Sequence, residues 1–135
     1  NLRVPIGTPI KNIFEFCGGK ETTEKVLYGG PMMGIAIDDE NAVVLKQNNA
    51  ILFFENVTPP KTTPCIKCGR CAHACPMLLT PANVNAALRK NNTEALCTLN
   101  INSCIECGCC SYSCPAGIPL TQQMRTAKAI LRRKK

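Results

Sequence analysis

The stretch CIKCGRCAHACP, residues 65–76, decides the fold of this 135-residue chain, and the same spacing recurs as CIECGCCSYSCP at residues 104–115. Each copy orders its cysteines as C-x2-C-x2-C-x3-C and ends on a proline. The motif positions of the two runs account for eight of the eleven cysteines, and Cys109 is a ninth cysteine inside the second run. Four thiols in so short a stretch converge on one point in space, which favours metal binding over disulfides scattered along the chain.

The ligand type and the spacing predict a 4Fe-4S cube at each run, because every iron of a cube needs one soft, negatively charged ligand. Structural zinc is the alternative, although zinc sites usually combine two separated C-x2-C pairs. In two-cluster ferredoxins with this run, the fourth cysteine ligates the other cube. The crossed sets are Cys65, Cys68, Cys71 and Cys114 for cluster 1, and Cys104, Cys107, Cys110 and Cys75 for cluster 2.

Three cysteines and the single histidine stay outside these sets. Cys109 is expected to fill a small apolar position near the cluster, because its use as a ligand would break the two-residue spacing. Cys17 and Cys97 lie on apolar helical stripes and are expected to be buried. His73 is expected at the surface or beside the cluster, because four thiolates already complete the ligand set.

The cysteine count also bounds the compartment. A secreted disulfide scaffold would favour an even number of cysteines and a signal peptide, and the chain shows neither, so a reducing compartment is expected. The chain begins at Asn1 without a Met, which suggests an excerpt from a longer polypeptide. No apolar stretch approaches the roughly 20 residues of a membrane-spanning helix, so the chain is expected to be soluble or peripheral.

The net charge of +7 would by itself suggest a nucleic-acid or membrane partner. Each oxidised cube with its four thiolates contributes about −2, which leaves the loaded protein at about +3. Aromatic residues make up only 4% of the chain, too few for the interleaved stacking of a nucleic-acid surface. We therefore expect no nucleic acid among the partners.

The fold class predicted is α+β, with a small β-grasp-like domain at 1–58, a Pro-rich linker at 59–64 and a mainly α-helical dicluster ferredoxin domain at 65–135. In the first domain, Thr8-Pro9 is expected to cap a helix whose apolar face carries Ile10, Ile13, Phe14 and Cys17. The expected strands of a small mixed sheet are Leu2–Ile6, Lys25–Tyr28, Ala42–Leu45 and Ala50–Phe54.

In the second domain a helix is expected after Thr80-Pro81, ending at Asn91-Asn92, and a shorter one is expected after the cap Thr93. A last helix from Pro119 should bury a stripe formed by Leu120, Met124, Ala127 and Leu131. A basic strip lies beside that stripe and is interpreted as a docking surface for acidic subunits or a membrane, with a plain solvated face as the alternative. It comprises Arg125, Lys128, Arg132, Arg133, Lys134 and Lys135.

The motifs GTPI at 7–10 and GGPMMG at 29–34, together with the two Cys runs, make the chain resemble the C subunit of the Rnf electron-transport complex. The glycines at 29, 30 and 34 fit no dinucleotide or P-loop pattern and are interpreted as a tight turn. The resemblance implies a soluble-ligand-binding β-grasp domain followed by the dicluster domain, and it carries over to all eight cluster ligands. A similar β-grasp module in respiratory complex I has one cluster motif, which favours Rnf.

What the resemblance implies about function is an electron-relay module that is not catalytic alone. Family members are peripheral subunits on the cytoplasmic face of the cell membrane, in a translocase that couples electron transfer between NADH and ferredoxin to Na⁺ or H⁺ movement. FMN and NADH are expected only in an upstream domain that nothing here matches. The partners implied are the other subunits and ferredoxin. The alternative is an iron-sulfur subunit of another flavin- or NADH-linked oxidoreductase, such as a complex I-like enzyme or a helical-ferredoxin dehydrogenase.

Overall fold

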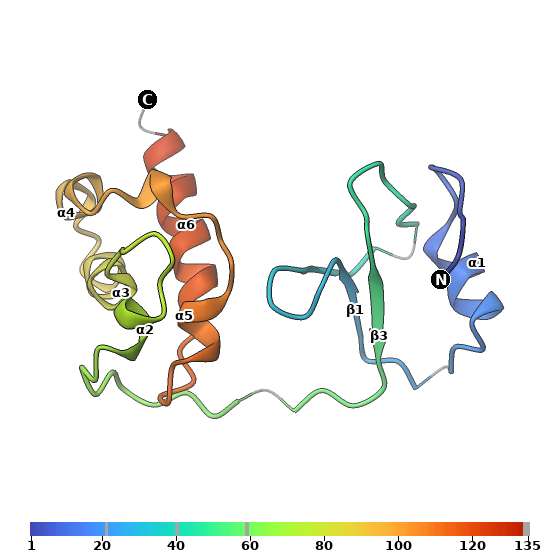
Figure 1. The fold of residues 1–135 in the computed structure, drawn as a ribbon, viewed down its shortest axis with the longest axis horizontal. Helices are drawn as coiled ribbons and strands as arrows, with labels where there is room; N and C mark the ends of the chain where they lie inside the picture. Colours follow the sequence, from blue (N-terminus) through green and yellow to red (C-terminus); the bar gives the residue numbers. More distant parts are fainter. Residues whose placement is uncertain (21, 40, 59, 134–135) are drawn as a thin grey trace. The chain divides into compact units, whose positions relative to one another are not determined.

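The computed structural model describes residues 1–20, 22–39, 41–58 and 60–133. The chain divides into two compact units, Asn1–Pro59 and Pro60–Lys135. Figure 1 shows one helix and a small sheet in the first unit, and a group of helices in the second. The architecture is therefore a mixture of helix and a small antiparallel sheet.

The sheet of the first unit has three antiparallel strands, β1 (Lys25–Tyr28), β2 (Ile35–Ile37) and β3 (Ile51–Phe54), in the order β2-β1-β3. The expected mixed sheet is thus wrong for the described residues, because both neighbours of β1 run against it. Strand β2 was not expected from the sequence. It has only three residues, and none of them is buried, so it carries little hydrophobic pattern to recognise.

Of the predicted strands, one is absent and another is reduced to a single bridge. Leu2–Ile6 is not a strand: Pro5 has no N–H for a ladder, and Leu2 and Ile6 are exposed. In the 42–45 segment only Val43 makes a bridge, to Pro9. The pairing is short because helix α1 (Ile10–Phe16) begins one residue later and takes the chain out of the extended conformation.

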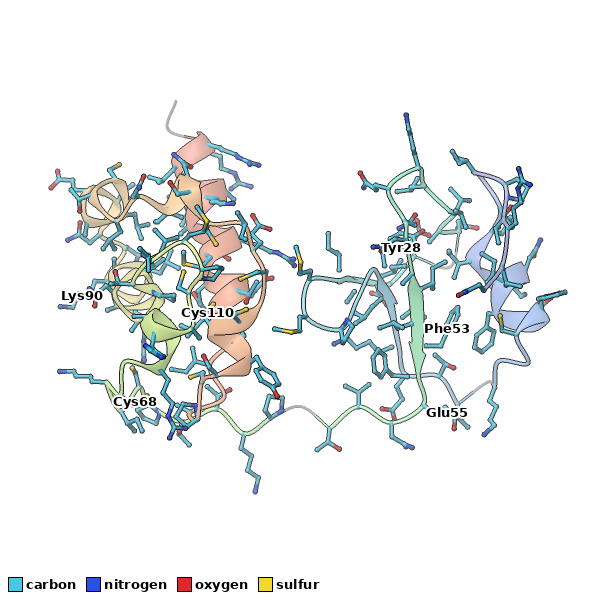
Figure 2. The ribbon with its side chains drawn as sticks, in the orientation of Figure 1. Tyr28, Phe53, Glu55, Cys68, Lys90 and Cys110 are labelled. Atoms are coloured by element: carbon cyan, nitrogen blue, oxygen red, sulfur yellow. The ribbon has the colours of Figure 1, made fainter. Side chains whose placement is uncertain are left out.

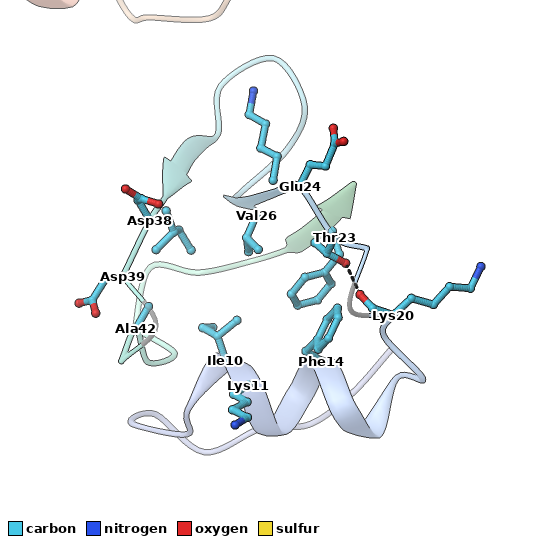
Figure 3. Close-up of a pocket in the computed structure, with 13 residues that line it drawn as sticks. Ile10, Lys11, Phe14, Lys20, Thr23, Glu24, Val26, Asp38, Asp39 and Ala42 are labelled. Carbon is cyan, nitrogen blue, oxygen red and sulfur yellow. Dashed lines mark hydrogen bonds between the residues drawn. The ribbon is translucent and has the colours of Figure 1, made fainter. Parts of the chain in front are cut away.

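Helix α1 covers one face of the sheet, as the apolar positions predict. Ile10 is buried, and the rings of Phe14 and Phe53 pack with their centroids 5.0 Å apart. Figure 3 shows Ile10 and Phe14 pointing from α1 towards Val26 of β1. Between helix and sheet lies an open cavity of about 560 Å³ with an apolar floor and charged residues at its rim. The helix begins after Pro9, and the Thr8 hydroxyl donates to the Pro5 carbonyl instead of capping the helix.

The glycine motif at 29–34 forms the turn between β1 and β2. Gly34 N–H donates to the Gly30 carbonyl at 2.8 Å, which closes the turn. A Cβ atom on Gly34 would lie 2.5 Å from that same oxygen and 2.9 Å from the Tyr28 oxygen, both backbone atoms. Gly34 is thus required by close backbone approach, in agreement with its interpretation as a tight turn.

The second unit is helical. Its elements in chain order are α2 (Arg70–His73), α3 (Pro81–Arg89), α4 (Thr93–Thr98), the 3₁₀ turn η1 (Ile101–Ser103), α5 (Cys109–Tyr112) and α6 (Leu120–Arg133). Pro81 opens α3 at its first turn, as expected. For α4 the cap is Asn92, whose Oδ1 accepts from Ala95 N–H at 3.0 Å, so the expectation of Thr93 was one residue late.

The core of this unit is where α3, α4 and α6 pack together, as Figure 1 shows. Its fully buried members include Val84, Leu96, Ile101, Met124 and Ala127. The predicted stripe on α6 is confirmed, since Leu120, Met124 and Ala127 are buried and Leu131 packs against the same cluster. Side-chain burial thus anchors helices that are too short to be stable alone.

Candidate metal centres

The two Cys runs adopt the same backbone conformation. Lys67 and Glu106 have φ of 57° and 56°, and the following Gly69 and Gly108 have φ of 77° and 86°. A one-turn helix follows each glycine, α2 in the first run and α5 in the second. The sequence repeat is therefore also a structural repeat, in which the first three motif cysteines of each run lie around a common centre.

Two cavities lie at these centres, and each takes its cysteines from both runs. The first is lined by Cys65, Cys68, Cys71 and Cys114. The second is lined by Cys104, Cys107, Cys110 and Cys75. Each cavity has a volume of about 20 Å³, so the two are alike in size. Cys68, before α2, and Cys110, on α5, are labelled in Figure 2.

Backbone contacts explain why the end of the second run lies beside the first. Thr63 lies just before the first run and Ala116 lies just after the second, and the Thr63 N–H donates to the Ala116 carbonyl at 2.9 Å. Gly117 has a positive φ of 64°, and a Cβ there would lie 2.8 Å from the Lys61 oxygen. Helices α2 and α5 also pack against each other. The chain segments that enter and leave the runs are therefore held together.

The second cavity has the more structured surroundings. Leu79 N–H donates to Cys75 Sγ at 3.4 Å, Glu106 N–H donates to Cys104 Sγ at 3.3 Å, and Cys110 Sγ lies 3.7 Å from Thr121 Oγ1. By contrast, Cys65 and Cys68 at the first cavity are exposed. The two centres thus share their thiol donors but differ in solvent access and in hydrogen bonding to sulfur.

An ion-pair cluster covers the second run. Glu106 Oε1 lies 2.8 Å from Lys128 Nζ, and Glu106 Oε2 lies 3.0 Å from Arg125 Nε. The hydrogen bond from Lys128, together with that from Arg125, holds the pKa of Glu106 below its usual value despite partial burial. Arg125 and Lys128 thus bind Glu106 within the unit and are not part of a plain solvated face, and docking by the basic strip stays a prediction. Arg132 and Arg133 remain exposed, and Lys134 and Lys135 lie outside the described residues.

The pKa of the Cys110 thiol is raised, first of all by burial. The pKa of Cys109 is also raised, mainly by its hydrogen bond with Cys107. Both thiols therefore favour the protonated form, and a metal that binds Cys110 must displace that proton. Among the described cysteines, Cys109 lines neither cavity, although it lies next to one.

For the residues outside the two ligand sets, the expectation for His73 is confirmed and those for Cys17 and Cys97 are wrong. Cys17 lies just past the end of α1 and is exposed, and Cys97 is exposed on α4, so the prediction that both are buried was wrong. Both lie next to apolar positions of short helices, where a difference of one residue in position moves a side chain from the buried face to the exposed face. His73 is exposed, as expected, and lines neither of the two cysteine cavities. The residues that sequence reasoning missed are Glu106 and Thr121. The change from Lys67 to Glu106 within the repeat was the available signal.

The donor set fits an iron-sulfur cluster better than a single ion. Within residues 1–20, 22–39, 41–58 and 60–133, no three His, Cys, Asp or Glu side chains form a group that could hold one metal ion. The four cysteines of each set instead line a cavity with mostly apolar walls. Soft thiolates around such a space are the ligands that a cube of iron and sulfide takes. Among the described residues, no helix is long and apolar enough to cross a membrane.

Comparison with known proteins agrees with this chemistry. Residues 61–118 match the 4Fe-4S dicluster domain family. The C subunit of the ion-translocating oxidoreductase complex of Rhodobacter capsulatus is 47% identical over 134 residues, which is 97% of this chain and 26% of that protein.

Two further relatives carry more specific names. The C subunit of the proton-translocating ferredoxin:NAD(+) oxidoreductase complex of Clostridium ljungdahlii is 40% identical over 94 residues, or 67% of this chain and 21% of that protein. The corresponding C subunit of the Na(+)-translocating complex of Acetobacterium woodii is 36% identical over 93 residues, again 67% of this chain and 21% of that protein. The chain spans about a quarter of the length of these relatives or less. Across the part it spans, it belongs to the family of C subunits of ion-translocating oxidoreductase complexes.

Proposed function

We propose that this chain is an electron-relay module with two 4Fe-4S clusters, bound in crossed fashion by the two Cys runs. One cluster takes Cys65, Cys68, Cys71 and Cys114, and the other takes Cys104, Cys107, Cys110 and Cys75. The observation that carries the proposal is that each cavity is lined by three cysteines of one run and the fourth cysteine of the other. Two clusters held this way are near neighbours, because helices α3 and α6 each contribute lining residues to both cavities.

Each cluster, when bound, accepts and returns single electrons. The protein's own contribution is to hold the eight thiolates, to limit water and to direct hydrogen bonds at sulfur. Cys71 and Cys110 are buried, and the Leu79 and Glu106 amides point at the sulfurs of the second set. This function needs no residue for acid-base or group-transfer chemistry, because the electron is the only species transferred.

The family relationship supplies the setting of this proposal. The chain would relay electrons inside a membrane-associated complex that couples electron transfer between NADH and ferredoxin to Na⁺ or H⁺ translocation, on the cytoplasmic face of the membrane. FMN and NADH would bind elsewhere in the full subunit. Within the chain, we propose that residues 1–58 form the β-grasp domain, which the antiparallel sheet and its covering helix support. Residues 59–64 would be the linker and 65–135 the dicluster domain.

Iron and sulfide analysis tests the cluster content. After anaerobic preparation we expect about eight irons and eight acid-labile sulfides per chain, because two complete ligand sets are present. Stoichiometric zinc without labile sulfide would refute the proposal. EPR of the reduced protein should show two interacting clusters, since the sites are adjacent.

The crossed ligation is tested by pairs of substitutions. Serine is a harder and poorer ligand for iron, so Cys114→Ser should perturb one cluster or convert it to a three-iron form with its own EPR signal. We expect Cys114→Ser and Cys65→Ser to alter the same EPR component. If Cys114→Ser instead matches Cys104→Ser, each run holds its own cluster and the crossed assignment is wrong.

A further inference from the structure

The two Cys runs differ at one charged position that their shared backbone makes directly comparable. Lys67 and Glu106 occupy the same place between the first two cysteines, with the same left-handed backbone conformation. Lys67 is exposed to solvent. The Glu106 side chain is 30% exposed and pairs with two cations from α6. The repeat thus presents two equivalent loops in opposite electrostatic settings.

Lys128 ties α6 to the second run at two points. Its Nζ donates to the Cys104 carbonyl at 2.6 Å and to Glu106 Oε1 at 2.8 Å. The Lys128 side chain is only 13% exposed, so its charge is screened less than that of a surface lysine. Arg125 completes the group through its Nε, 3.0 Å from Glu106 Oε2. Lys128 thus places a largely buried positive charge beside the second run.

We propose that Lys128 is a positioning residue that sets the reduction potential of the cluster at Cys104, Cys107, Cys110 and Cys75. This inference rests on the proposed function. A reduced cluster carries one more negative charge than an oxidised one, so a nearby buried cation favours reduction. Glu106 holds Lys128 on the Cys104 carbonyl and partly offsets its charge. The hydrogen bonds to Cys75 and Cys104 sulfur act in the same direction as Lys128.

The alternative is that the ion pairs only fasten α6 to the loop. In that case the loss of either partner would loosen the same contact, and both losses would change the cluster in the same direction. An electrostatic role makes a different prediction, because Lys128 and Glu106 carry opposite charges. Removal of the cation should lower the potential, and removal of the anion should raise it.

The experiment is an anaerobic redox titration of the full chain followed by EPR, with Cys104→Ser used to assign the second cluster's signal. Lys128→Gln should shift that cluster to lower potential and Glu106→Gln should shift it to higher potential. Lys128→Arg should restore most of the wild-type value, because the charge is kept. Lys67→Gln is the matched control at the first run, where solvent screens the charge, and its shift of the first cluster should be smaller.

Shifts of the same sign for Lys128→Gln and Glu106→Gln, or no shift in either, would overturn the inference. Should Lys128→Gln fail to take up clusters, Arg125→Gln still decides the matter: it removes a cation and leaves the Cys104 carbonyl contact in place. A lower potential in Arg125→Gln supports the electrostatic role, and an unchanged or higher one contradicts it. Failure of the proposed function is separate, since it would appear as missing iron and sulfide in the wild-type chain.

Discussion

Substitution of Met124 by alanine links the core of the second unit to its metal centre. Met124 is 1% exposed within the core cluster, and it also lines the cavity of Cys104, Cys107, Cys110 and Cys75. The change removes the γ-methylene, the sulfur and the methyl group, at ~0.8 kcal/mol for each buried group. With the cost of the residual cavity, we expect a loss of about 3 kcal/mol. A unit of this size has a stability of about 4–11 kcal/mol.

Leu96→Ala is the matched control. Leu96 is also 1% exposed and belongs to the same core cluster, but it does not line that cavity. Both variants should therefore lose similar stability. Only Met124→Ala should open the wall of the second cavity to water.

Loss of a cluster makes unfolding irreversible, so the comparison is made between rates. In the same urea concentration, anaerobic unfolding followed by circular dichroism should be accelerated up to ~100-fold in both variants. Bleaching of the brown cluster absorbance under native conditions with an iron chelator should be faster in Met124→Ala than in Leu96→Ala. Equal bleaching in the two variants would refute the idea that Met124 shields the cluster.

The remaining predictions concern both units. Removal of the clusters should abolish most of the helical circular dichroism of the second unit, because cluster binding contributes folding free energy where the core is small, and unchanged helicity would count against this. Tyr28→Phe should cost about 1 kcal/mol, because the hydroxyl donates to the Val43 carbonyl at 2.6 Å. Burial raises the pKa of Tyr28, so this stabilisation should be intact at neutral pH and disappear as the pH rises past the raised pKa. If the stability of Tyr28→Phe falls with alkaline pH in the same way as that of the wild type, this expectation is contradicted. Gly34→Ala should unfold the first unit at lower urea concentration than Gly30→Ala, whose added Cβ meets nothing within 4 Å, and equal midpoints would show that the turn can adjust. The isolated chain should not reduce its clusters with NADH, and measurable NADH-dependent bleaching would disprove this.

The second unit could be largely predicted from the sequence because its signals are local. Spacing of the cysteines, Pro81 after a cap residue, and the apolar stripe of α6 each depend on residues close together in the chain. The left-handed conformation of Gly69 and Gly108 also follows from their place within the repeat. Such patterns need no knowledge of the neighbouring elements.

The features that were missed depend on contacts between distant residues. Strand β2 forms because Ile35–Ile37 pairs with β1. Its side chains are not buried, so the sequence there carries no hydrophobic pattern that would predict a strand. In the same way, Arg125 and Lys128 looked like a solvated strip on their own helix. Their partner Glu106 lies about 20 positions earlier in the chain, and only the fold brings it to α6.

The interleaved walls of the two cavities have a consequence for biosynthesis. Neither cavity is complete until the ribosome has passed Cys114, because each takes lining residues from both runs. At ~5–20 residues per second, the stretch from Cys75 to Cys114 takes about 2–8 s to synthesise. During that interval the nascent first run presents its thiols without the cysteine that completes their cavity. If the clusters bind as we propose, neither can be completed before both runs have been synthesised, and a chain interrupted between them would emerge with thiols open to oxidation or to the wrong metal.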